Sequence, residues 1–177
     1  EIAYELLGLD ADTRVTSYNE DARVYLMRPP TKAYDLIFGD AFNDFSVPYH
    51  LTTKEFNERV AAWLAEDGIY VVNIIDGTFR RFLTAYVRTL RQTFDYVYVV
   101  PNAKSWRTVS RDTFVIVATD APLDFSAFDP DSRFVSGALS THEVDMLLAE
   151  SQQVLLTDRH APVEQMLAPV YLNQTRN

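Results

Sequence analysis

The sequence contains no cysteine, which excludes disulfide bonds and thiolate sites of any kind. Glycine is scarce too: five glycines are scattered over 177 residues, so no glycine-rich loop that cradles a phosphate or nucleoside can be built from them. No apolar run approaches the roughly 20 residues needed to cross a bilayer, and no signal peptide opens the chain. We therefore expect that this segment makes no membrane contact and is cytoplasmic. It could also be the cytoplasmic portion of a parent protein that is fused to a membrane domain.

Basic residues are the minority. The chain has 16 lysines and arginines against 25 aspartates and glutamates, a formal net charge of -9. Such a field repels phosphate backbones, so nucleic acid is not an expected partner. The three histidines, His50, His142 and His160, lie far apart, and no two of them have the spacing of a pair of ligands on one helix. We expect no metal site.

Apolar residues, in contrast, make up 47% of the chain, and aromatic residues 13%. This composition is typical of a folded protein, and the length suits one domain with a sizeable core. Short apolar, β-branched or aromatic runs predict strands at 34–38, 69–75, 96–100 and 113–119.

Helical spacing of apolar residues predicts helices between these strands. One helix is expected at about 53–66, after a capping box formed by Thr52 and Glu55, and another at 79–90. Residues 1–8 fit the tail of a helix, and a later helix should be capped by Ser140 and Glu143. The segments 15–18 and 23–26 are expected to be short strands or loops.

Strands that alternate with helices indicate an α/β protein with an open, mostly parallel sheet and helices on its faces. The linker between 96–100 and 113–119 shows no helical period, so these strands should form an antiparallel hairpin at one edge. In such sheets ligands bind beyond the carboxyl ends of the strands. The loops after residues 38, 75 and 100 are therefore the places to look for a site.

Two carboxylates follow the first firm strand. Asp40 stands at its carboxyl end, and Asp44 comes four residues later. A carboxylate in that position can bind an ammonium group and take a proton from an attacking amine, whose nitrogen must lose a proton to be a nucleophile. The alternative, an aspartate that caps its own loop, stays open on spacing alone.

The sequence around these carboxylates resembles the spermidine synthase, or polyamine aminopropyltransferase, family. It reads DAFNDFSVP over residues 40–48, LTTKEF over 51–56 and EDGI over 66–69. The resemblance implies a Rossmann-like fold of the S-adenosylmethionine-dependent methyltransferase type. It also implies that Asp40 is the general base and that Asp44 contacts the amine substrate.

Two further segments resemble the same family. Asp21 and Ala22, about 19 residues before Asp40, are similar to the pair that contacts the adenine of decarboxylated S-adenosylmethionine, the aminopropyl donor. Residues 156–164, LTDRHAPVE, resemble the family's carboxyl-terminal motif. Asp158 and His160 could line the amine pocket, but we expect Asp158 to cap a helix and His160 to lie on the surface.

The resemblance covers roughly residues 1–170 and implies one partial catalytic domain, 1–177. Its Rossmann-like core would be 1–122, and 123–177 would be a carboxyl-terminal extension. The family's glycine-rich loop and the acidic residue after its second strand have no counterpart here. The fold is therefore expected to be truncated at its amino end, starting within the family's second helix, and we expect no donor bound to this segment itself.

The loop after the third strand departs from the family. Ala103 stands where a tyrosine helps to hold the diamine, Asn73 stands where many members have glutamine, and Lys104 would repel a cationic acceptor. The acceptor is thus expected to be a small amine that need not be a polyamine.

Three functions remain open on the sequence. The first is aminopropyl transfer from decarboxylated S-adenosylmethionine to an amine, with Asp40 as base and the segment itself inactive. The second is a non-catalytic Rossmann-like appendage or sensor of a larger protein, and the third is an S-adenosylmethionine-dependent methyltransferase. Because the family's central strands are missing, strand 34–38 should present an open apolar edge that is closed by direct pairing of other strands or by a second copy in a homodimer.

Overall fold

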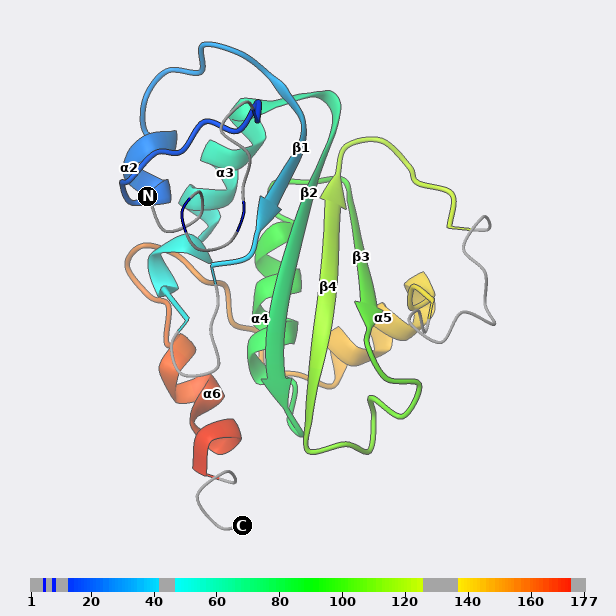
Figure 1. Ribbon diagram of the computed structural model, residues 1–177. Coiled ribbons are helices and arrows are strands. Elements are labelled where there is room, and N and C mark those ends of the chain that lie inside the picture. The colour runs from blue at the N-terminus through cyan, green and yellow to red at the C-terminus, as the bar shows by residue number, and fades with distance from the viewer. Residues whose placement is uncertain (1–4, 6–7, 9–12, 42–46, 126–136, 173–177) are drawn as a thin grey trace.

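The structure is a computed structural model that describes residues 5, 8, 13–41, 47–125 and 137–172. Its elements, in chain order, are α2 (Ala22–Leu26), β1 (Tyr34–Gly39), the 3-10 turn η1 (Tyr49–Leu51), α3 (Lys54–Trp63), β2 (Leu64–Gly77), α4 (Arg81–Leu90), β3 (Tyr96–Pro101), β4 (Arg111–Thr119), α5 (Thr141–Ala149) and α6 (Val163–Leu172) (Figure 1). None of the described helices is long and apolar enough to cross a membrane.

The four strands form one sheet in the order β1-β2-β4-β3. The hairpin of β3 and β4 is antiparallel and occupies one end of the sheet, as expected. The prediction of a mostly parallel sheet is wrong for the described residues. Only β1 and β2 are parallel, because β4, antiparallel to both of its neighbours, inserts between β2 and β3.

One face of the sheet carries the core. Alternate residues of β2, Tyr70, Val72 and Ile74, are buried against the helical layer, in one cluster with Phe82 and Tyr86 of α4. Helix α4 lies behind β2 in Figure 1. Alternation along the strand sends the intervening side chains to the opposite face. The sheet is therefore firmly packed on its helical side.

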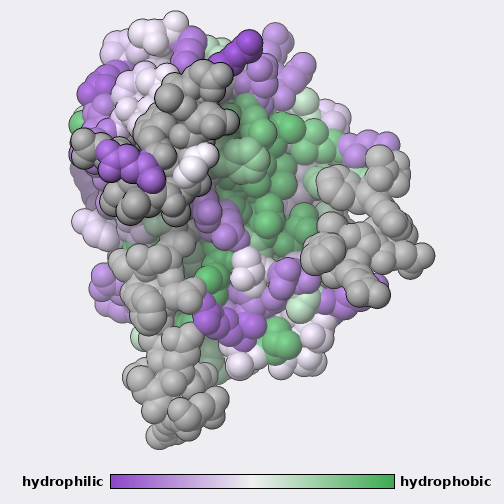
Figure 2. Space-filling view, in the orientation of Figure 1, coloured by the Kyte–Doolittle hydropathy of each residue, from purple (hydrophilic) through white to green (hydrophobic). Residues whose placement is uncertain are grey.

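The opposite face is apolar and less covered. Phe38 of β1, in register with Val71 of β2, is 69% exposed, and Leu36 on the same face is also exposed. Figure 2 views the molecule from this side and shows a hydrophobic area in its centre. β1 is also the outermost strand of the described sheet, so its second edge has no described partner strand.

Several local predictions need correction. Residues 23–26 belong to helix α2, because the Asp21 side chain caps them. Helix α3 begins one residue later than the capping-box reading and ends at Trp63, since Thr53 is its N-cap and accepts a hydrogen bond from the Phe56 amide. The expected cap at Asp158 implied a helix after it, but the bounds of α6 were not predicted. The capping box of Ser140 and Glu143 is confirmed at the start of α5.

Strand boundaries were predicted more accurately, except that β2 begins five residues earlier than expected, directly after α3. The segment 15–18 forms no strand. Most of the helix expected at 1–8 lies outside the described residues.

Candidate functional site

A pocket of about 340 Å³ lies between α2, the end of β1 and α3. The residues that line it are Ala22, Leu26, Ile37, Phe38, Gly39, Asp40, Ala41, Leu51, Phe56, Val60 and Tyr70. It thus brings together Ala22 and Asp40, two residues singled out from sequence. Almost all of the lining residues are apolar, and Asp40 is the one charged residue among them.

Asp40 directly follows β1 and is exposed to solvent. The side-chain amide of Asn73, in the neighbouring strand β2, donates a hydrogen bond of 3.1 Å to Oδ1 of Asp40. No described residue donates a hydrogen bond to Oδ2. The carboxylate is therefore oriented through one oxygen, and the other oxygen can receive a proton or an ammonium group.

Asp21 precedes α2 and acts as its N-cap. Its Oδ1 accepts hydrogen bonds from the amides of Arg23 (2.9 Å) and Val24 (3.1 Å), and its Oδ2 lies 2.9 Å from Nε2 of His50. The hydrogen bond with His50 is the largest of the interactions that lower the pKa of Asp21, and it outweighs the opposing effect of burial. Asp21 does not line the pocket, whereas its neighbour Ala22 does. Asp44 lies outside the described residues.

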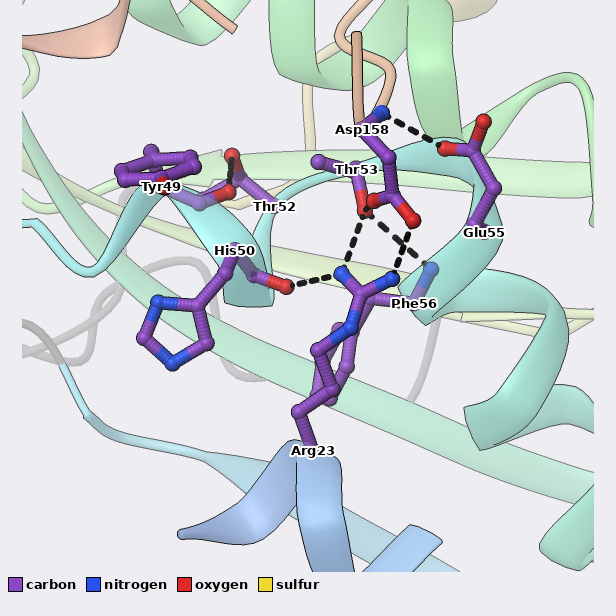
Figure 3. Close-up of polar contacts among 8 residues, drawn as sticks. All are labelled: Arg23, Tyr49, His50, Thr52, Thr53, Glu55, Phe56 and Asp158. Carbon is purple, nitrogen blue, oxygen red and sulfur yellow. Dashed lines mark hydrogen bonds and ion pairs between the residues drawn. The ribbon is translucent and has the colours of Figure 1, made fainter. Parts of the chain in front are cut away.

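Arg23 connects three segments of the chain through hydrogen bonds and an ion pair (Figure 3). Its guanidinium group donates to the carbonyl oxygen of His50 (2.6 Å), to Oγ1 of Thr53 (3.1 Å) and, in an ion pair, to Asp158. Thr53 in turn donates to Asp158 at 2.8 Å, and the Asp158 amide donates to Glu55 at 3.0 Å. Helix α2, which has no buried residue of its own, is thereby fixed to α3 and to the carboxyl-terminal segment.

The side chain of Asp158 therefore binds Arg23 and Thr53 and, contrary to expectation, does not cap a helix that follows it. Desolvation opposes its ionisation, but the hydrogen bonds from Arg23 and Thr53 outweigh that effect and lower the pKa of Asp158. His160 is exposed, as expected, and exchanges backbone hydrogen bonds with Thr157. Within the described ranges no group of three or more histidine, aspartate or glutamate side chains could hold a metal ion.

A second carboxylate near a strand end, Asp76, was not singled out from sequence. It is 1% exposed and accepts hydrogen bonds from the amides of Gly77 (2.7 Å) and Leu83 (2.8 Å). Burial raises its pKa to about 6, although these hydrogen bonds and the nearby Arg80 oppose that rise. Arg80 is itself buried and adopts a left-handed backbone conformation (φ 48°). Asp76 thus belongs to the interior rather than to the pocket.

No family model matches the sequence. The chain is 42% identical over 162 residues to a polyamine aminopropyltransferase from Vibrio vulnificus, a match that covers 85% of this chain and 52% of that relative. The chain is thus spermidine synthase-like in sequence, as its motifs indicate. It is also 30% identical over 156 residues to an N-terminal histidine N-methyltransferase from Emericella nidulans, covering 80% of this chain and 28% of the relative.

Its fold matches the solved structure of a probable spermidine synthase from Corynebacterium glutamicum with a TM-score of 0.74, at 19% identity, over 92% of this chain and 61% of that one. The Rossmann-like, methyltransferase-type fold implied by the sequence is therefore confirmed. The chain spans about half the length of the aminopropyltransferase that it matches.

Two residues of this region were missed in the sequence. Arg23 directly follows the Asp21 and Ala22 pair, but its partner Asp158 is 135 positions away, and one sequence holds no signal for such a contact. Tyr70 looks like any strand residue of the core. Only the tertiary structure places it in the wall of the pocket.

Proposed function

We propose that this spermidine synthase-like chain supplies the base and part of the donor site for transfer of an aminopropyl group to a small amine. The observation that carries the proposal is the position of Asp40, at the pocket and oriented by Asn73. The nitrogen lone pair of the amine attacks the carbon next to the donor sulfonium. The carbon–sulfur bond breaks toward sulfur, which leaves as a neutral thioether, and Asp40 takes the proton from the amine.

The donor in this proposal is decarboxylated S-adenosylmethionine. The apolar pocket fits a flat nucleoside base, with Ala22 in its wall and Asp21 holding the helix that carries Ala22. No glycine-rich loop is present to hold the rest of the donor. We therefore expect weak binding of S-adenosyl compounds and no tight complex in calorimetry. Asp44 is proposed to contact the amine.

Methyl transfer is the second candidate function. The sequence similarity to a histidine N-methyltransferase favours it, since that relative also acts on a nitrogen by its name. The same base would serve, because a nitrogen that accepts a methyl group must also lose its proton. The two functions differ in the donor, S-adenosylmethionine or its decarboxylated form, and in which carbon bonded to sulfur is attacked.

The test is a transferase assay on the full-length protein with labelled S-adenosylmethionine and its decarboxylated form, against a panel of amines and histidine peptides. Asp40→Asn should lower kcat by about 100-fold or more with little change in KM. Asp35→Asn, an exposed aspartate of the same strand that does not line the pocket, is the matched control and should leave kcat unchanged. Undiminished turnover of Asp40→Asn would show that Asp40 is not the base. Absence of turnover with every donor would instead favour the non-catalytic appendage or sensor.

We also propose that two copies associate through the open edge of β1. Leu36 and Phe38 are exposed there, and strand β1 contains neither lysine nor proline, residues that protect sheet edges. Sedimentation should reveal a dimer that Phe38→Lys dissociates. A monomeric wild-type chain at high micromolar concentration would refute it.

A further inference from the structure

Tyr70 places a hydroxyl group in the otherwise apolar wall of the pocket. Its ring projects from β2 toward β1, where Gly39 leaves room for it. A Cβ atom at position 39 would lie 2.8 Å from the Tyr70 hydroxyl oxygen, closer than real Cβ contacts allow. Tyr70 is only 2% exposed and lines the same pocket as Asp40 and Ala22. The hydroxyl is thus fixed in a position where solvent hardly reaches it.

This hydroxyl has more hydrogen-bonding capacity than the described residues use. Its one partner among them is the hydroxyl of Tyr86, at an O···O distance of 3.4 Å. Each tyrosine brings one proton, and a contact between two hydroxyl groups uses only one of the two. Tyr86 is fully buried and does not line the pocket. Burial raises the pKa of Tyr70 to about 12, so it keeps its proton at neutral pH.

A buried hydroxyl group without an acceptor is costly, and such groups are normally satisfied by protein, water or ligand. The arrangement of lowest cost has Tyr86 donating to Tyr70, which leaves the Tyr70 proton free to point elsewhere. The pocket is the adjacent space in which an acceptor can lie. The other lining residues are apolar apart from Asp40, so they provide flat apolar contact around this one donor.

We propose that Tyr70 is a specificity-determining residue of this pocket, whose hydroxyl donates a hydrogen bond to an acceptor atom on the edge of a flat heteroaromatic ring. The inference rests on the proposed function, in which the base of a nucleoside donor occupies the pocket. It adds the selection rule: a ring with a nitrogen acceptor at that edge binds, and the same ring with carbon and hydrogen there binds less well.

The test uses 5′-methylthioadenosine, the thioether product of aminopropyl transfer, as the probe, titrated into the 177-residue chain and followed by NMR to millimolar concentration. Tyr70→Phe, which removes only the hydroxyl oxygen, should weaken binding about tenfold. The matched control is Tyr86→Phe, which removes the other hydroxyl of the pair and should leave the affinity within about twofold of wild type. Thermal unfolding checks that both variants are folded.

A second arm needs no variant. The second arm uses analogues of the probe in which one ring nitrogen at a time is replaced by a C–H group. All of them should bind the wild-type chain with the affinity of the probe itself, except the analogue that lacks the acceptor nitrogen, which should bind about tenfold less tightly. That analogue should lose nothing further in Tyr70→Phe, because both changes remove the same hydrogen bond. This pattern identifies the acceptor atom.

Equal affinity of wild type and Tyr70→Phe overturns the inference, and so does a wild-type chain that fails to bind the probe at millimolar concentration. The proposed function fails separately. Asp40→Asn should bind the probe normally while it loses turnover. Normal turnover of Asp40→Asn together with weak probe binding by Tyr70→Phe would therefore rule out Asp40 as the base and still support the role of Tyr70.

Discussion

Asp40 and Asp76 occupy similar places in the sequence pattern but different environments. Each lies at or near the carboxyl end of one of the two parallel strands, Asp40 just after β1 and Asp76 as the penultimate residue of β2. Asp40 is exposed and accepts one described hydrogen bond, from a side chain. Asp76 is buried and accepts two from backbone amides. A strand end thus provides a position for chemistry, and the surrounding groups decide whether it is used.

The turn at the end of β2 explains why Asp76 is buried and structural. Helix α4 begins after β2 with Arg80 as N-cap, and Arg80 makes no side-chain cap of its own. Asp76 reaches the amide of Leu83 in the first turn and takes over that role. Arg80 donates to the carbonyl oxygens of Asp76 (2.9 Å) and Gly77 (2.7 Å), which fixes the turn. The same residue type is structural at one strand end and available for chemistry at the other.

The largest expected effect is the difference in unfolding free energy between variants that lack the Asp76 carboxylate and variants that lack the Asp40 carboxylate. Asp76→Ala should lower the free energy of unfolding by about 3 to 5 kcal/mol, because it leaves two buried amide donors without an acceptor and removes one of the two carboxylates, with Asp112, that oppose the charge of the buried Arg80. Asp40→Ala should change it by less than about 0.5 kcal/mol. Denaturant unfolding of both variants measures the contrast. A comparable loss in both would show that exposure does not distinguish these sites.

The second prediction concerns pH. Since the pKa of Asp76 is raised to about 6 from an ordinary 3.8, the folded chain holds the proton more tightly than the unfolded chain between these values. This group should therefore make stability fall as pH rises from about 4 to 6, by on the order of 2 kcal/mol. Asp76→Asn should abolish its share of that slope. An identical pH profile for the variant would mean that Asp76 titrates normally.

How far the sequence predicts these features depends on their range along the chain. Strands β1, β3 and β4 and the capping box of α5 were predicted because their signals are local: apolar runs, and Ser140 three residues before Glu143. Family resemblance suggested Asp40 and Ala22, which the structure places in one pocket.

Long-range features were not predictable in this way. Insertion of β4 between β2 and β3 depends on pairing that no local pattern encodes. Glu55 has the spacing of a capping box with Thr52, yet it accepts a hydrogen bond from the distant Asp158 amide. The cap moved to Thr53 because the Thr53 hydroxyl both accepts from the helix and donates to Asp158.

A third prediction tests another exposed carboxylate, Asp158, through its partner Arg23. Arg23→Ala should cost roughly 1 to 2 kcal/mol and should speed amide exchange in α2, because α2 has no buried residue to hold it otherwise. Arg28→Ala is the matched control. It removes an exposed pair with Glu20 and should cost less than about 0.5 kcal/mol. Unchanged exchange in α2 after Arg23→Ala would assign the anchoring to other contacts of the helix, such as the ring contact between Tyr25 and Trp63.

The smallest expected effect concerns Asp21, where a structural and a ligand-binding role make different predictions. Asp21→Ala removes the N-cap of α2 and should cost about 0.5 to 1 kcal/mol. Asp21→Asn keeps an oxygen for the amides of Arg23 and Val24, and asparagine caps helices as well as aspartate, so stability should stay within about 0.5 kcal/mol of wild type. Because α2 then stays in place, any loss of 5′-methylthioadenosine affinity in Asp21→Asn reports a direct contact between the carboxylate and the ligand. If Asp21→Asn binds like wild type while Asp21→Ala binds less well, the aspartate acts only by holding Ala22 in the pocket wall.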